Sequence, residues 1–175
     1  MISQGISHTA YDVMREYMIT GAELDGKYQI PMMERYTDRP GEDTVDFKDS
    51  FSPKIKNHRK LTVNFYIHDC EFERIWNNPD RYLEHLKCFH SVIAPDFSMA
   101  VGQDGMPFAM NIWQKYRNHA LSYYLSMNGI RVIPNVNIPP EYCYDWAFDG
   151  VPKRSTVACC TNGRIKARAS REGFC

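Results

Sequence analysis

The sequence lacks the short motifs by which common nucleotide-binding and hydrolytic sites are recognised. Its 175 residues contain no G-x-x-x-x-G-K-[ST], G-x-G-x-x-G, G-x-S-x-G or H-E-x-x-H. The six cysteines show no C-x-x-C spacing, which argues against a zinc ribbon or a redox pair, and we expect free, mostly buried thiols. Any chemistry must therefore be inferred from how the chain is arranged.

Long hydrophobic runs are absent as well. The uninterrupted apolar stretches are far shorter than the roughly 18 residues that a membrane-spanning helix needs, and the N-terminal segment lacks the charged and then apolar layout of a signal peptide. We therefore expect a cytoplasmic protein with no membrane contact. Because 43% of the residues are hydrophobic, the chain can bury one substantial core, and a single domain over residues 1–175 is predicted.

The net charge is zero, yet acidic and basic residues are separated along the chain. Residues 1–50 hold ten acids and five bases, whereas residues 153–175 hold six bases and one acid. A basic segment of this kind can bind phosphate or nucleic acid, and it can equally be a solvated surface. Both interpretations stay open, and Arg164 and Lys166 are the residues that would neutralise phosphate.

From residue 61 onward, strand-like and helix-like segments alternate. The predicted strands are rich in β-branched and apolar residues and cover 61–69, 91–98, 130–136 and 155–161. Helices are predicted between them over 79–89, 106–127 and 140–148. In the helix over 106–127, apolar residues form a stripe at helical spacing, and the other side carries Asn111, Lys115, Asn118 and Ser122. The alternation predicts an α/β fold with a mainly parallel sheet built from successive βαβ units.

The first 60 residues differ, because Gly, Pro and Asp interrupt every long pattern there. We expect an irregular N-terminal layer over 1–60, a βαβ core over 61–166 and, over 167–175, the start of an incomplete or truncated C-terminal unit. The sheet could be a partial β/α barrel, a small open sheet or a divergent doubly wound domain. A full barrel does not fit in 175 residues.

Polar residues follow each predicted strand. In parallel α/β proteins the carboxyl ends of the strands share one edge, where ligand sites form. The candidate ligand-binding residues at that edge are His68, Asp69, Asp96, Ser98, Asn135, Thr161, Asn162, Arg164 and Lys166. Their carboxylates, amides, hydroxyls and bases suit a divalent cation, a phosphate or a general acid–base pair. Polar residues also end strands simply because the chain turns toward water there, and that reading stays open.

Three long segments carry a resemblance to a known family. In order, they read FERIWNNPDRYLEHLKCFHSVIAPDFSM, MPFAMNIWQKYRNHALSYYLSMNGIRVIPNV and FDGVPKRSTVACCTNG. Over residues 61–166 the chain thus resembles the domain of unknown function 4417 family of bacterial, phage and mobile-element proteins. That family has no assigned activity, so the resemblance implies a phage or mobile-element protein and no reaction. The link over 99–105 is longer than in the family, and we expect the chain to end before the last strand and helix of longer relatives.

Two functions from different classes follow from these residues. In the first, the protein is a binding protein that holds a phosphate-containing ligand, either a nucleotide or nucleic acid, at the strand ends. In the alternative, it is a metal-dependent enzyme acting on a nucleotide or nucleic-acid phosphate, with Asp69 and Asp96 as catalytic residues that hold Mg or Mn. The absence of a nucleophile–base pair favours binding and the two carboxylates favour catalysis, so the sequence leaves open whether the protein is an enzyme. It does not predict the oligomeric state.

Overall fold

The central sheet consists of four short strands. In the computed structural model, which describes residues 12–102, 105–137 and 140–160, they are β3 (Asp43–Asp46), β4 (Leu61–Asn64), β5 (Ser91–Ile93) and β6 (Val132–Ile133). They pair in the order β3-β4-β5-β6, and all three pairings are parallel. Among the described strands nothing joins β6 back to β3, so the sheet is open and does not close into a barrel.

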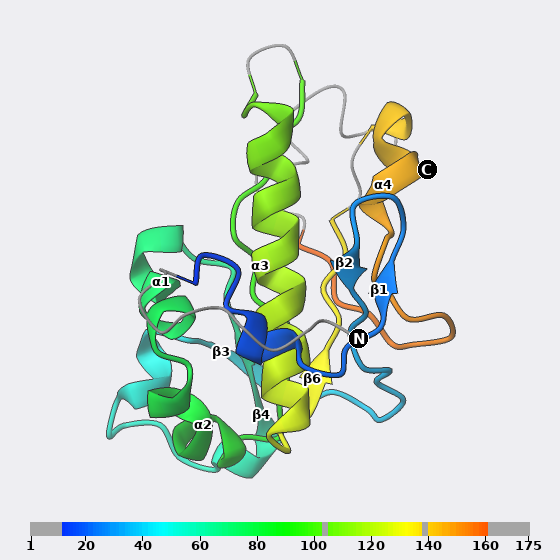
Figure 1. The fold of residues 1–175 in the computed structure, drawn as a ribbon. Helices are drawn as coiled ribbons and strands as arrows, with labels where there is room; N and C mark the ends of the chain where they lie inside the picture. Colours follow the sequence, from blue (N-terminus) through cyan, green and yellow to red (C-terminus); the bar gives the residue numbers. More distant parts are fainter. Residues whose placement is uncertain (1–11, 103–104, 138–139, 161–175) are drawn as a thin grey trace.

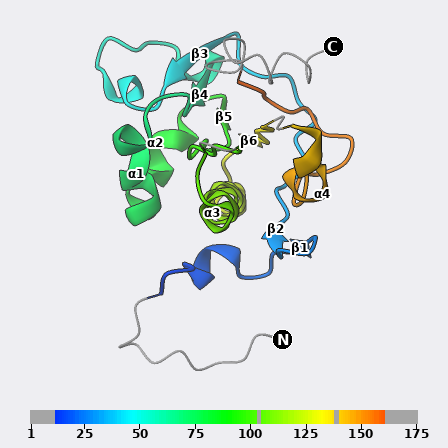
Figure 2. The same ribbon diagram turned by 90° about the horizontal axis from the view of Figure 1, so that it is seen from above.

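Three helices cover one face of this sheet (Figure 1). α1 (Asp69–Asn77) and α2 (Asp80–Lys87) connect β4 to β5, and α3 (Phe108–Met127) connects β5 to β6. Figure 2 shows all three on the same side of the strands. This arrangement is what crossovers of one hand produce when parallel strands follow one another in chain order.

A row of valines joins the sheet to these helices. The residues paired across the four strands are Val45, Val63, Val92 and Val132. All four are buried in a core that also contains Phe72 of α1, Leu86 of α2 and Leu121 of α3. Fully burying an apolar side chain of this size stabilises a protein by about 1.5–3 kcal/mol, and a slip of one residue would turn each valine to the other face. The row therefore specifies the register of the sheet.

The opposite face of the sheet carries a smaller core. Ile93 and Ile133 follow the valines of their strands, so their side chains point to the other side, where they pack with Tyr36. The backbone N–H of Tyr36 donates to Ser155 Oγ at 3.0 Å, which fixes this segment near the C-terminal part of the described chain. The sheet is thus covered on both faces, as expected for a parallel sheet.

Short elements surround α3 on the sides that do not face the sheet (Figure 2). They are the 3-10 helix η1 (Glu16–Ile19), the antiparallel pair of β1 (Leu24–Asp25) and β2 (Ile30–Pro31), the 3-10 helix η4 (Glu141–Cys143) and α4 (Tyr144–Ala147). Two further 3-10 helices, η2 (Asp49–Phe51) and η3 (His58–Lys60), lie between β3 and β4. Because η1 and β2 pack against α3, this helix is covered from two sides.

The polar side of α3 is consequently buried. The polar residues opposite its predicted apolar stripe, Asn111, Lys115, Asn118 and Ser122, are all less than 7% exposed. Met110 and Met127 of the same helix are about half exposed, at 47% and 58%. The sequence pattern marks these polar residues as a separate face, and the tertiary structure places that face inside the protein.

The predicted α/β class and parallel sheet are confirmed. α2 and α3 fall within the predicted helices, and the segment predicted as a short helix over 140–148 forms η4 and α4. The fourth predicted strand is reduced, in the described part of the chain, to a single parallel bridge between Asn135 and Ala158. None of the described helices combines the length and apolar character needed to cross a bilayer.

Two elements differ from the sequence-based expectation. Strand β3 lies within the segment predicted to be irregular; its sequence DTVD holds one apolar residue, but Val45 is buried against the neighbouring strand. Residues 69–77, expected to be the end of a strand and a short link, form α1. The backbone N–H of His68 donates to Glu71 Oε2 at 3.3 Å, a contact typical of a helix start. The first predicted strand therefore ends at Asn64, before His68 and Asp69.

The described cysteines do not form a buried set. Cys70, Cys88 and Cys159 are exposed, Cys160 is half-buried, and Cys143 is buried. The prediction of mostly buried thiols is therefore wrong. Cys70 of α1 and Cys88, the residue that follows α2, turn toward solvent, which their apolar character alone did not indicate.

Candidate functional site

The segment that follows β5 lies at the centre of the candidate site. The carboxylate of Asp96 accepts hydrogen bonds through Oδ1 from Nδ2 of Asn135 and from Nδ2 of Asn137, each at 2.9 Å. The hydroxyl of Tyr66 donates to Asn135 Oδ1 at 2.9 Å. Residues that follow β4, β5 and β6 are therefore joined by side-chain hydrogen bonds at one edge of the sheet. The structure brings the predicted residues Asp96 and Asn135 together and adds Tyr66 and Asn137.

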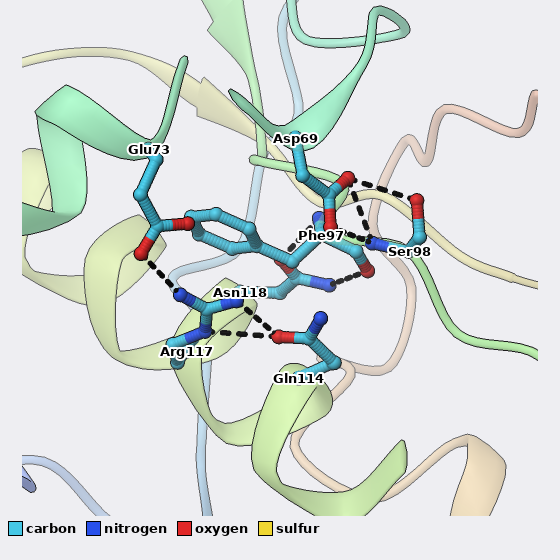
Figure 3. Close-up of polar contacts among 7 residues, drawn as sticks. All are labelled: Asp69, Glu73, Phe97, Ser98, Gln114, Arg117 and Asn118. Atoms are coloured by element: carbon cyan, nitrogen blue, oxygen red, sulfur yellow. Dashed lines mark hydrogen bonds and ion pairs between the residues drawn. The ribbon is translucent and has the colours of Figure 1, made fainter. Parts of the chain in front are cut away.

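Asp69 and Ser98 form a second contact at this edge. Asp69 is the first residue of α1, and its carboxylate accepts hydrogen bonds from Ser98 Oγ at 2.8 Å and from the Ser98 backbone N–H at 3.1 Å (Figure 3). An acid in the first turn of a helix is favoured by the helix dipole. Asp69 thus holds the segment after β5 against α1, and the neighbouring His68 is exposed.

Phe97, between Asp96 and Ser98, is clamped by α3 (Figure 3). Asn118 Oδ1 accepts the Phe97 backbone N–H at 2.8 Å, and Asn118 Nδ2 donates to the Phe97 carbonyl at 3.3 Å. The guanidinium of Arg117 lies 3.8 Å from the centre of the fully buried Phe97 ring and pairs with Glu73 of α1 at 2.7 Å. Gln114 Oε1 accepts a further hydrogen bond from Arg117 Nε at 2.9 Å. Two helices therefore fix this segment, which gives the edge a defined shape.

A buried lysine lies in a pocket beside this segment. Lys115 of α3 is 3% exposed; its Nζ donates to the Ala147 carbonyl at 2.8 Å and lies 3.2 Å from His119 Nε2. Burial lowers the pKa of Lys115 to about 8. The other residues that line the pocket are Met33, Ala94, Pro95, Met99, Asn118, His119, Asn135, Asn137 and Ala147. Its volume is about 20 Å³, enough for one group of the size of a water molecule.

His119 is a neutral acceptor for this lysine. Its Nδ1 faces the Pro31 carbonyl at 3.0 Å, so Nδ1 carries the proton that donates there and Nε2 accepts from Lys115 Nζ. Burial first, and then the charge of Lys115, lowers the pKa of His119 well below its ordinary value. Gly150 allows this contact, because its φ is +72° and a Cβ there would lie 2.6 Å from His119 Nδ1. The positive charge of the pocket therefore belongs to Lys115.

Lys115 is not among the site residues predicted from the sequence. The sequence places Lys115 and Asn118 on the polar side of a helix, a pattern typical of a solvated face. One feature of the sequence could have indicated burial of that side. Three of its four polar residues carry an amide or a hydroxyl group, and only one is charged. By itself this feature does not distinguish a buried polar face from an exposed one.

Some of the predicted site residues lie outside the described part of the chain. These are Thr161, Asn162, Arg164 and Lys166, and their predicted roles stay predictions. Within residues 12–102, 105–137 and 140–160, no three His, Cys, Asp or Glu side chains are grouped so that they could hold a metal ion.

Comparison with known proteins identifies the family. Two relatives are each described as "Gene 1 protein", one from Mycobacterium phage L5 and one from Mycobacterium phage D29; they are 33% and 32% identical over 112 residues, or 64% of this chain. The matched segment covers 48% and 40% of those proteins, so the chain spans half or less of the length of the curated relatives it matches. No solved structure matches the chain. Residues 22–175 match the family model "Domain of unknown function (DUF4417)", and the chain belongs to this family, which it shares with phage proteins.

Proposed function

We propose that the chain binds a phosphate-containing ligand, a nucleotide or nucleic acid, at the carboxyl ends of β4, β5 and β6. The observation that carries this proposal is the buried ammonium group of Lys115. With a pKa of about 8 it is mostly protonated at pH 7, and no carboxylate of the described residues forms an ion pair with it. Its hydrogen-bond partners are neutral, and the carboxylates of Asp149 and Asp25 act on its charge only from beyond ion-pair distance, so an anionic ligand would supply a counter-charge in direct contact.

The amides around Lys115 support an anion rather than a cation. Asn118, Asn135 and Asn137 line the same pocket, and side-chain amide N–H groups are donors suited to phosphate oxygens. Asp96 accepts hydrogen bonds from two of these amides, which orients them. In this proposal Asp96 is a positioning residue, since its own charge would repel a phosphate.

The size of the pocket limits how the ligand can sit. A volume of about 20 Å³ accommodates a single phosphate oxygen beside Lys115, so the rest of the ligand lies outside. The predicted basic residues Arg164 and Lys166 would then neutralise phosphates outside the pocket, as the charge pattern of the sequence suggests.

Metal-dependent catalysis on a phosphate ester is the second candidate. It is favoured by one observation: Ser98, two residues after Asp96, binds the carboxylate of Asp69, which brings the segments that carry both acids to one edge. In this candidate Asp69 and Asp96 would hold Mg or Mn. Thermal unfolding with Mg²⁺ or Mn²⁺ plus a nucleotide tests it, because stabilisation by the metal should disappear in Asp96→Ala. A metal response that is equal in the two proteins, or absent in both, contradicts it.

Thermal unfolding also tests phosphate binding. Inorganic phosphate, a panel of nucleotides and a single-stranded oligonucleotide are added in turn to the wild type, Lys115→Met and Lys87→Met. A ligand at 100 times its Kd stabilises a protein by about 2.7 kcal/mol, which raises Tm measurably. We expect at least one of these ligands to stabilise the wild type and Lys87→Met but not Lys115→Met. Lys87→Met is the control, because it removes an exposed ammonium group on α2. The proposal fails if Lys115→Met responds like the wild type or if no phosphate compound stabilises any of the three.

A further inference from the structure

A second, larger pocket lies between the first turn of α3 and the segment of η4 and α4. Figure 1 shows α4 standing beside the beginning of α3. The pocket is lined by Val101, Gly102, Met106, Phe108, Asn111, Tyr142, Cys143, Asp145 and Trp146, and its volume is about 390 Å³. A volume of this size is within the range of small-molecule sites.

One residue of the lining, Asn111, has an unsatisfied acceptor. Its side chain is 1% exposed, and its Nδ2 donates to the Ala100 carbonyl at 3.1 Å and to the Met106 carbonyl at 3.0 Å. These contacts decide the orientation of the amide, because the opposite orientation would set Oδ1 against two carbonyl oxygens. Asn111 Oδ1 accepts no hydrogen bond from any described residue. Buried acceptors in proteins almost always have a donor, and a ligand N–H would supply one here.

Aromatic rings form the walls. Phe108 packs edge-on against Trp146 with ring centres 5.6 Å apart, and it is still 49% exposed. Tyr142, which also lines the pocket, is 68% exposed. Exposed flat rings beside a cavity favour a flat ligand, because stacked aromatic faces attract one another.

The charge of the pocket lining indicates which polar groups the ligand carries. Among the described residues that line it, Asp145 is the one that carries a charge, and none is a lysine, arginine or histidine. Asn111 Oδ1 and the Asp145 carboxylate are acceptors, and the donors of the lining, the Tyr142 hydroxyl and the Trp146 indole N–H, carry no charge. A ligand with N–H donors is therefore favoured, and a phosphate at this rim is disfavoured.

We propose that this pocket binds a planar heteroaromatic ring that carries an amino group, as the bases of adenosine and cytidine do. The amino group donates to Asn111 Oδ1, and the ring stacks on Tyr142 or Phe108. This inference does not depend on the phosphate site at Lys115, because the ligand needs no phosphate and none of its contacts is shared with that site.

Calorimetric titration of the full chain with nucleosides tests the proposal. Adenosine is compared with purine riboside, which lacks the amino group and otherwise has the same ring. We expect adenosine to bind about three- to tenfold more tightly, the effect of one neutral hydrogen bond. Equal affinity of the two nucleosides, or no heat from adenosine, cytidine or guanosine at millimolar concentration, overturns the proposal.

Two tyrosine variants locate the site. Tyr142→Ala should weaken adenosine binding about tenfold through the loss of a stacking partner. Tyr144→Ala is the matched control, because Tyr144 is also exposed, at 44%, lies two residues further along and does not line the pocket. We expect its affinity to equal that of the wild type. An unchanged affinity in Tyr142→Ala, or an equal loss in both variants, contradicts the assignment.

Discussion

The side-chain amide of Asn118 pairs with both backbone polar groups of Phe97. Its Oδ1 accepts the N–H at 2.8 Å and its Nδ2 donates to the carbonyl at 3.3 Å, so α3 offers the segment after β5 the hydrogen bonds that a neighbouring strand would otherwise supply. Strand β5 ends at Ile93, yet the chain keeps a defined path for several residues more. The position of Asp96 at the edge of the sheet depends on this pairing.

Asn118→Ala should therefore destabilise the protein by about 2–3 kcal/mol, because it leaves two buried backbone groups unsatisfied. Urea unfolding measures this as a lower midpoint with an unchanged slope. The control is Met127→Ala on the same helix, where the side chain is 58% exposed and a change within about 0.5 kcal/mol is expected. Equal midpoints for Asn118→Ala and the control would show that the pairing contributes nothing.

Arg117→Lys should also destabilise the fold, by about 1–2 kcal/mol, although it keeps the positive charge. The guanidinium carbon lies 3.8 Å from the centre of the Phe97 ring while the group reaches Glu73, and an ammonium group cannot replace a planar group in both contacts. Lys87, which pairs with the exposed Glu84, provides the comparison: Lys87→Arg should leave the free energy of unfolding nearly unchanged. A similarly small effect at both positions would contradict the stacking argument.

Gly150→Ala should be more disruptive than Gly129→Ala. Both glycines have positive φ, +72° and +83°, so alanine is strained by about 1 kcal/mol at either position. At Gly129 a Cβ meets no atom within 4 Å, whereas at Gly150 it would lie 2.6 Å from both His119 Nδ1 and the Pro31 carbonyl. We expect Gly150→Ala to cost at least about 2 kcal/mol more in thermal or urea unfolding. Similar losses in the two variants would mean that His119 is not packed as described.

The buried Lys115 predicts a stability that rises at alkaline pH. Its pKa is lowered from 10.5 to about 8 in the folded protein, so between these values the unfolded chain binds more protons than the folded one. Stability must then increase with pH in that window, and the penalty for the buried charge is complete below about pH 8 and gone above 10.5. The gain is on the order of 3 kcal/mol at most.

Comparison with Lys115→Met isolates this effect. Other groups that titrate in the same range, the tyrosines and cysteines, are present in both proteins and cancel in the difference. Urea unfolding at pH 7.5, 8.5 and 9.5 should show the wild type gaining stability relative to Lys115→Met as the pH rises. Parallel curves for the two proteins would indicate that Lys115 titrates normally.

Much of the sheet could be predicted because strand and helix patterns are local. Apolar runs around Val63, Val92 and Val132 predict three of the four strands, and parallel pairing follows from the helices between them. The residues at which the strands end were predicted less accurately. Apolar and aromatic residues continue past the last paired residue of β4 and β5, and helices bury them instead. Phe65 and Phe97 are both fully buried outside any strand.

The sequence predicts where the candidate site lies, at the carboxyl ends of the strands, but not all of its contacts. That Asp96 and Asn135 lie together follows from parallel strands with polar residues at their carboxyl ends. The sequence does not predict that Asp69 belongs to a helix and binds Ser98, because the run CEFERIW is short enough to form either a link or a helix. The helix forms because its buried residues Phe72, Ile75 and Trp76 meet the core on one side.

The sequence by itself determined the α/β class, the parallel order of β4, β5 and β6, and the edge at which their polar residues meet, because each depends on the periodicity of a short stretch. Only the tertiary structure decided that β3 joins the sheet and that the polar side of α3 is buried. The reason is that burial depends on segments far apart in the chain: β2 and α4 cover Lys115 and His119 from positions about 85 residues before and 30 residues after them. A helix whose polar face is covered in this way becomes a candidate site, and the same helix left open would have been a solvated surface.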